Sequence, residues 1–181
     1  NEGNNAVCFD DGTLTVIPLP DLHDDGGTWN GFSPDPVTQG QTWSAWLDVR
    51  SDYAASGGFW VDFYASTDTT ISSSDYLIGF TWVSGVASGE YVDVNLISIA
   101  FPTSIPGGDY YIGAIIDLFG NLVAESNEGN NAVCFDDGTL TVRAPLVING
   151  TAGADVVALS LPDVSTLRVV MNAVPTDYVL A

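Results

Sequence analysis

Oxygen-bearing side chains in two loops are the groups of this sequence best suited to chemistry. The first loop, residues 68–75, has carboxylates at its ends, Asp68 and Asp75, and hydroxyl groups at Thr70, Ser72 and Ser74. Calcium takes roughly six to eight oxygen ligands and accepts them from flexible loops. The loop therefore predicts a calcium site, although a turn in which Asp and Ser bond their own backbone explains the same residues.

A second loop, residues 117–131, offers a similar set of oxygen atoms. It carries Asp117, Asn121, Glu125, Glu128 and Asn130. Neither loop has the spacing of an EF-hand. We predict Ca²⁺ as a cofactor, held by Asp68 and Asp75 in the first loop or by Asp117, Asn121, Glu125 and Glu128 in the second.

Groups that could catalyse a reaction are scarce. The single histidine, His23, lies beside Asp21, Asp24 and Asp25, where it could join a metal site or sit in a solvated loop. Acidic residues are so frequent that a pair of carboxylates is no specific sign of glycoside hydrolysis. No serine or cysteine stands in a nucleophile motif. We therefore predict that the protein is not an enzyme.

The two cysteines, Cys8 and Cys134, could cross-link neighbouring molecules. A disulfide needs Cα atoms within about 7 Å of each other. Equivalent positions in consecutive modules are separated by on the order of 30 Å if a strand of ten residues lies between them. The thiols are then buried and inert, or they form intermolecular bonds, or an intrachain bond forms because residues 1–16 fold back.

An exact internal repeat sets the organisation of the chain. Residues 1–16 and 127–142 both read NEGNNAVCFDDGTLTV, at a period of 126 residues, which is the size of one sandwich domain. We predict that residues 1–16 are the final strand of a preceding repeat, that 17–143 form a complete repeat, and that 144–181 begin a different β domain or cap. Residues 1–16 could pack on this chain, pair with a neighbouring molecule or be disordered.

Charge and composition limit the partners. The 181 residues include 23 Asp and Glu against 3 Lys and Arg, a net charge of −20. Such a surface repels nucleic acid and anionic lipid, and no apolar run is long enough to span a bilayer. Abundant Gly, Ser, Thr, Asp and Asn favour an extracellular protein. The chain opens on Asn1 without a leader, so we expect an interior piece of a longer precursor.

Seven segments alternate between apolar and polar residues, as half-buried strands do. They are residues 20–23, 42–50, 58–66, 76–83, 91–100, 109–117 and 132–142. Turn residues separate them at the spacing of an immunoglobulin-like antiparallel β-sandwich, with a barrel as the alternative. The fold class is thus all-β, with an extra N-terminal strand segment and a short C-terminal β piece.

The C-terminal piece has too few residues for a stable sandwich of its own. We expect strands at residues 146–149, 156–161, 167–171 and 178–180. Residues 148–155, INGTAGAD, resemble the opening of haemolysin-type calcium repeats, although the nonapeptide array itself is missing. A turn containing Gly and Asp explains these residues equally well.

Five tryptophans raise the question of an aromatic surface. Alternation directs Trp43 into the core and Trp46 and Trp60 outward, with Trp29 and Trp82 elsewhere. Outward rings could stack on a sugar, pack across strands or pack between modules. A planar exposed row would favour polysaccharide binding, and burial under a neighbour would favour assembly.

Several short motifs occur in an order that resembles the bacterial cell-adhesion-related domain family, CARDB. They are TQGQ at 38–41, FYASTD at 63–68, SDYLIG at 74–79, PGGDYY at 106–111 and VAESNEGNN at 123–131. The resemblance covers about residues 20–142, and ESNE followed by NN is its most specific element. It implies a seven-stranded immunoglobulin-like sandwich, usually in tandem, in large exported proteins, and no enzyme. We therefore expect a structural or adhesive repeat with neighbouring or identical modules as partners, and a carbohydrate-binding accessory module as the alternative.

Overall fold

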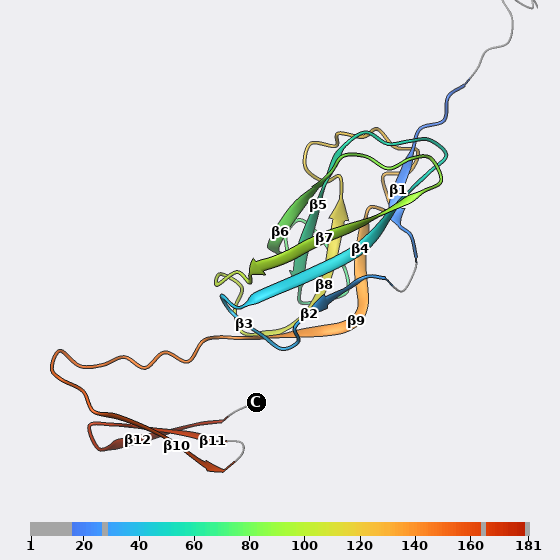
Figure 1. The fold of residues 1–181 in the computed structure, drawn as a ribbon. Helices are drawn as coiled ribbons and strands as arrows, with labels where there is room; N and C mark the ends of the chain where they lie inside the picture. The colour runs from blue at the N-terminus through green and yellow to red at the C-terminus, as the bar shows by residue number, and fades with distance from the viewer. Residues whose placement is uncertain (1–15, 27–28, 164–165, 180–181) are drawn as a thin grey trace, which may run out of the picture. The chain divides into compact units, whose positions relative to one another are not determined.

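Strands make up the regular structure of the described chain. The structure, a computed structural model, describes residues 16–26, 29–163 and 166–179. Twelve strands lie in these ranges. The contacts divide the chain after Ala144 into two units (Figure 1). Among the described residues, no helix has the length and apolar character needed to cross a membrane.

The first unit is a sandwich of two sheets (Figure 1). In the first sheet, β4 (Thr42–Asp52) is flanked on one side by β7 (Tyr91–Ala100) and on the other by β1 (Asp21–Asp24) and β2 (Gly31–Ser33). The second sheet has the order β3 (Val37–Thr38), β9 (Ala132–Arg143), β8 (Gly108–Ile116), β5 (Phe59–Ser66) and β6 (Tyr76–Val83). Only the β3–β9 pair of the described ladders is parallel. The segment before β4 thus contributes to both sheets, as in an immunoglobulin-like sandwich.

The seven strands predicted from alternation are present, with ends shifted by a few residues at most. The fold class is therefore confirmed. Two further strands, β2 and β3, were missed because they contain three and two residues and carry no alternating pattern of their own. Each forms because a long strand beside it supplies hydrogen-bonding groups, β4 for β2 and β9 for β3.

The core lies between the two sheets. From β4, the predicted inward residues Trp43, Ala45, Leu47 and Val49 are fully buried. Alternate residues of β5 face them: Phe59, Val61, Phe63 and Ala65. Burying one such large side chain contributes about 1.5–3 kcal/mol to folding, so this alternation is the main determinant of the register.

The outer face of the second sheet is partly covered as well. Asp62 and Tyr64 point away from the core, as alternation predicts, yet both are buried. A second apolar cluster of Tyr64, Ile71 and Ile115 lies on this face. Gly113 of β8 permits the close approach, because a Cβ there would collide with the Val133 carbonyl oxygen and with Ile71.

The second unit, residues 145–181, contains a three-stranded antiparallel sheet of β10 (Val157–Asp163), β11 (Thr166–Met171) and β12 (Val174–Val179). Asn172 and Ala173 both have positive φ and form the two-residue turn between β11 and β12. The strand expected at 146–149 is absent, since nothing pairs with that described segment. Thr151 donates its N–H and its hydroxyl to Asp155, so the INGTAGAD segment contains the turn that was the alternative interpretation.

Candidate functional site

Asp117 closes the loop that follows β8. Its carboxylate is buried and accepts the N–H groups of Leu122 at 3.1 Å and Val123 at 2.7 Å. Its own N–H donates to the carbonyl of Trp60 at 2.7 Å. The positive φ of Asp117 and of Asn121 turns the chain back on itself between these contacts. Asp117 thus satisfies backbone groups of its own loop.

Glu125 joins the same loop to the first strand. Its buried carboxylate accepts the N–H of Leu22 in β1 and, at 3.0 Å, the side-chain amide of Asn131. Burial, together with the negative charges of Glu128 and Asp117, raises the pKa of Glu125 to about 7. At neutral pH this group is therefore divided between its acid and its anion.

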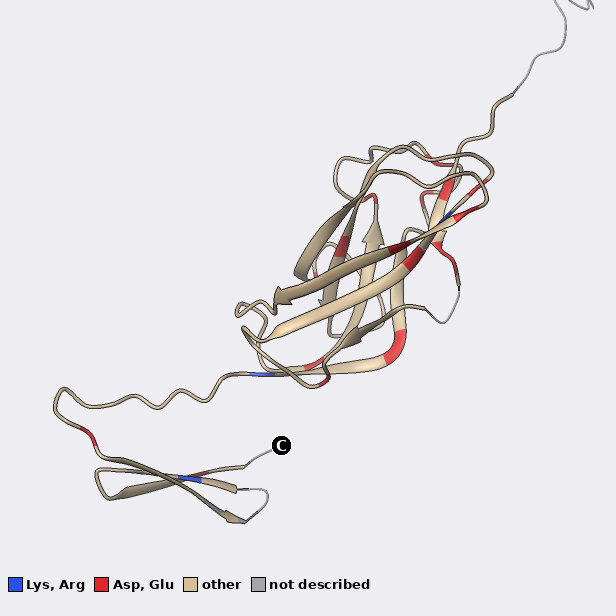
Figure 2. Cartoon of the chain, viewed as in Figure 1, with Lys and Arg blue, Asp and Glu red and all other residues tan. Residues whose placement is uncertain are grey.

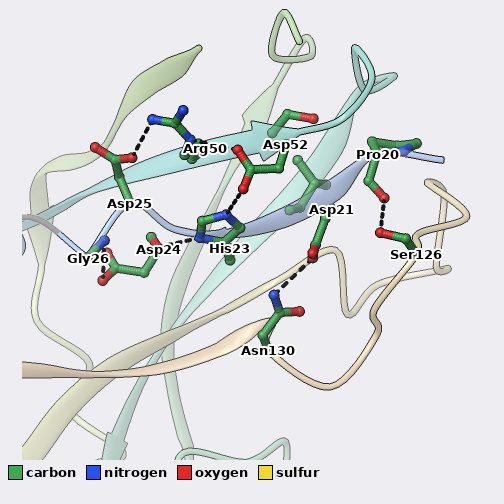
Figure 3. Close-up of polar contacts among 12 residues, drawn as sticks. Pro20, Asp21, His23, Asp24, Asp25, Gly26, Arg50, Asp52, Ser126 and Asn130 are labelled. Atoms are coloured by element: carbon green, nitrogen blue, oxygen red, sulfur yellow. Dashed lines mark hydrogen bonds and ion pairs between the residues drawn. The ribbon is translucent and has the colours of Figure 1, made fainter. Parts of the chain in front are cut away.

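Further contacts attach the ESNEGNN segment, residues 125–131, to the point where the chain enters the sandwich. The Ser126 N–H donates to the carbonyl of Pro20 at 2.8 Å. The Ser126 hydroxyl donates to the same carbonyl at 3.3 Å, and the Asn130 amide donates to Asp21 at 2.9 Å (Figure 3). Glu128 accepts the N–H of Glu125 at 3.1 Å. The most specific motif of the sequence is therefore a clasp that holds the first strand.

Among the predicted calcium ligands, Asp117, Glu125 and Glu128 lie near one another, while Asn121 is exposed. In the other loop, Asp68 accepts the Thr70 N–H at 2.7 Å and Asp75 accepts the Ser72 N–H at 2.7 Å. These bonds are the turn contacts of the alternative interpretation.

No group of three or more His, Cys, Asp and Glu side chains is arranged to hold a metal ion in the described ranges. The predicted acidic ligands each already accept at least one backbone N–H, which competes with a cation for their oxygens; they are Asp68, Asp75, Asp117, Glu125 and Glu128. Calcium binding stays a prediction.

His23 and Arg50 belong to a network of surface contacts between β1 and β4 (Figure 3). His23 Nε2 lies 3.3 Å from the carboxylate of Asp52. Arg50 pairs with the same carboxylate at 2.7 Å and with Asp25 at 3.1 Å. These half-exposed pairs fix the edge of the sheet, and each contributes little to stability.

Like charges face each other elsewhere in the same sheet. Asp48 of β4 lies opposite Asp93 of β7. Burial, followed by the hydrogen bond and the charge of Asp93, raises the pKa of Asp48 to about 6. The sequence places Asp48 on the outward face but contains no sign of its partner, because the pairing depends on the register between β4 and β7. Acidic residues occur on both sheets, whereas basic positions are few (Figure 2).

Cys134 is a free, half-buried thiol on the outer face of the second sheet. It packs against the cluster of Tyr64, Ile71 and Ile115. Burial, with a smaller effect from Asp136, raises the pKa of its thiol, which disfavours the reactive thiolate. Cys8 lies outside the described residues, so the predicted cross-link stays a prediction.

The two outward tryptophans lie on different sheets. Trp46 of β4 is tilted against Trp29, with ring centroids 6.5 Å apart. Trp60 of β5 meets Phe80 at 5.3 Å and Trp82 at 5.1 Å, both edge to face. The rings around Trp60 are therefore packed across the β5–β6 pair and do not form a planar row.

The CARDB family model matches residues 10–134. Comparison with curated proteins found no significant match. The crystal structure of the CARDB domain of the PF1109 protein from Pyrococcus furiosus, in complex with di-metal ions, is similar at a TM-score of 0.46 and 22% identity. That match covers 71% of this chain and 97% of that one.

Two other solved structures show how far the similarity extends. The solution NMR structure of the PF1109 domain has a TM-score of 0.44 at 22% identity and covers 70% of this chain and 97% of that one. A β-glucosidase from Listeria innocua, in complex with isofagomine, has a TM-score of 0.37 at 14% identity. The match covers 66% of this chain but 17% of the glucosidase. Because the CARDB family model matches more than half of the residues, the chain belongs to the CARDB family of domains from adhesion-related proteins of the cell surface.

Proposed function

We propose that this sandwich is a structural repeat in a secreted or surface-attached adhesion protein, joined end to end with modules of its own kind. The observation that carries the proposal is the place of the repeated sequence in the fold. Residues 132–142 of its second copy lie in β9, between β8 and β3. The first copy, residues 1–16, lies almost entirely outside the described residues, and by the same pattern it supplies the last strand of a preceding sandwich.

The connection between such modules would be short and stiff. Only residues 17–20 separate the first copy from β1, and two of these four residues are Pro18 and Pro20. Proline-containing linkers favour extended, semi-rigid backbone. Pro20 is buried, and its carbonyl accepts the Ser126 N–H. The clasp of residues 125–131 thus holds the entry point of the linker, which supports a fixed spacing between modules.

A chain containing two consecutive modules tests this proposal. A second copy of residues 17–142, inserted after Val142, reproduces the natural junction between Val16 and Ile17. Small-angle X-ray scattering should show two bodies at one preferred separation. Replacing Pro18, the exposed proline of the junction, by glycine should broaden that separation without changing the unfolding of either module. If the unsubstituted tandem already shows the broad distribution of the glycine variant, the stiff-array proposal is wrong.

Calcium is the proposed stabilising ion of this array. A net charge of −20 favours a cation that lowers repulsion within and between modules, and Glu125 lies near two other carboxylates. Thermal unfolding in calcium and in chelator measures the effect. Calcium should raise the melting temperature, and identical curves would refute calcium stabilisation while leaving the array proposal in place.

Polysaccharide binding is the second candidate, and it rests on Trp60 and its neighbours. Edge-to-face packing around Trp60 leaves no planar row of rings for stacking on sugars. Structural assembly with identical or similar modules is therefore the better-supported function. We propose no nucleic-acid binding, no membrane insertion and no enzyme activity for it.

A further inference from the structure

An aromatic cavity lies on the outer face of the second sheet, apart from the clasp. It has a volume of about 440 Å³. Its lining residues come from β5, β6 and the loop after β8, and they are Trp60, Asp62, Tyr64, Leu77, Phe80 and Phe119. Phe80 and Phe119 are largely exposed, at 57% and 73%. Aromatic rings at the rim and a single carboxylate inside define this cavity, which we call the Asp62 pocket.

Asp62 is an unusual group to find in such surroundings. It is only 3% exposed, and its Oδ2 atom has no hydrogen-bond partner among the described residues. Burial raises the pKa of this carboxyl. A buried carboxylate without a partner lowers stability, and proteins normally avoid it or neutralise it with an opposite charge. The described chain supplies no such charge, since its ion pairs involve His23, Arg50 and Arg168 and none includes Asp62.

The chemistry of the pocket matches an ammonium group on an apolar stem. Faces of Trp, Tyr and Phe attract cations, and a carboxylate oxygen without a partner accepts a hydrogen bond from an N–H. A quaternary ammonium cannot donate that bond. The compact ammonium of lysine needs only one oxygen, whereas the arginine fork is suited to two. The apolar walls suit the four methylene groups of a lysine side chain.

A sugar matches the pocket less well. Sugars present many hydroxyl groups and need several polar partners, but Asp62 is the only charged group in this lining. The lysine must also lie outside this sequence, which contains none and whose three Lys and Arg positions are all arginine. The net charge of −20 would attract a basic partner over long range.

We propose that the Asp62 pocket binds the side-chain ammonium of a lysine on a partner protein, with Asp62 accepting its hydrogen bond and the aromatic rings enclosing its stem. This inference goes beyond the structural role proposed above and does not depend on it, since one sandwich contains the whole pocket.

Titration of the intact chain with Nα-acetyl-lysine methylamide tests the proposal. NMR should show saturable shifts of the Trp60 indole signal, with a dissociation constant on the order of 1 mM. The signals of Trp46 on the other sheet and of Trp29, which packs against Trp46, should not shift. The same probe acetylated on Nε has no charge and should not bind. Equal binding of the acetylated probe, or no binding of the charged one at tens of millimolar, would overturn the proposal. Shifts produced by a cello-oligosaccharide in place of lysine would assign the pocket to carbohydrate and would also overturn it.

Two variants and a control locate the binding. Asp62→Asn keeps the shape and removes the charge, and it should weaken binding at least tenfold. Phe119→Ala removes a ring that is mostly solvent-exposed, so it should weaken binding severalfold while leaving the fold intact. Glu90→Gln removes one exposed charge elsewhere and should leave binding unchanged. If all three variants bind lysine as tightly as the parent chain, the attraction comes from overall charge and the pocket assignment is wrong.

Discussion

Replacing Glu125 by glutamine should flatten the pH dependence of stability between about pH 5 and pH 8. Glu125 has its pKa raised from 4.5 to about 7, mainly by burial. The folded protein therefore keeps this proton to a higher pH than the unfolded chain does. Between these two values the folded state binds more protons, so the free energy of unfolding falls as pH rises. At about 1.4 kcal/mol per pH unit, the contribution of this group is about 3 kcal/mol, complete below pH 4.5 and lost above pH 7.

Urea unfolding followed by tryptophan fluorescence measures this effect. The titration should be made in chelator and about 0.15 M salt, so that neither calcium nor weak screening alters the slope. The parent chain should lose about 2–3 kcal/mol between pH 5 and pH 8 through this group, and Glu125→Gln should not show that loss.

The comparison uses the slope of unfolding free energy against pH, not its absolute value. Glutamine presents an NH₂ group to one of the two donors, the Leu22 N–H or the Asn131 amide, and so loses one hydrogen bond. That loss of stability is the same at every pH and does not alter the slope. Glu90→Gln, at an exposed carboxylate, should keep the parent slope. A Glu125→Gln chain with the parent slope would refute the assignment of this pH dependence to Glu125.

Three further substitutions test other parts of the structure by the same unfolding assay. Asp48→Asn removes the repulsion from Asp93 and should stabilise the protein by about 1 kcal/mol at pH 8, after allowance for solvent screening. At pH 4 it should not stabilise the protein, and equal effects at both pH values would contradict this prediction. Asp117→Ala leaves two backbone N–H groups of its loop without their acceptor and should cost about 3 kcal/mol, so a loss below 1 kcal/mol would show that water replaces the carboxylate. Gly113→Ala places a methyl group against the Val133 carbonyl and should cost at least 3 kcal/mol, whereas Gly57→Ala meets nothing within 4 Å and should change stability by less than about 0.5 kcal/mol.

Much of the fold could be predicted because each long strand is amphipathic by itself. The inward residues of β4, such as Trp43 and Leu47, alternate with polar ones, and this pattern requires no knowledge of neighbouring strands. The short strands β2 and β3 have no such signal, since their pairing depends on the longer strand beside them. The strand expected at 146–149 had apolar residues but no partner.

The candidate site was predicted only in part. The loops were found through their oxygen-rich composition, and the structure shows Asp68 and Asp75 bonded to their own turns. Composition could not distinguish these exposed turns from the buried clasp around Glu125, because that difference depends on contacts with residues about 100 positions away.

The sequence by itself determined the seven alternating strands of the first unit, the family motifs and the exact repeat that ends in β9, because each of these is written in local residue patterns. Only the tertiary structure decided which carboxylates are buried. Asp62 looks like an ordinary outward residue of a strand, yet rings from β6 and from the loop after β8 enclose it. Asp48 faces a like charge only because the register between β4 and β7 places Asp93 opposite it. Burial and charge pairing depend on elements brought together by folding, and no single segment contains that information.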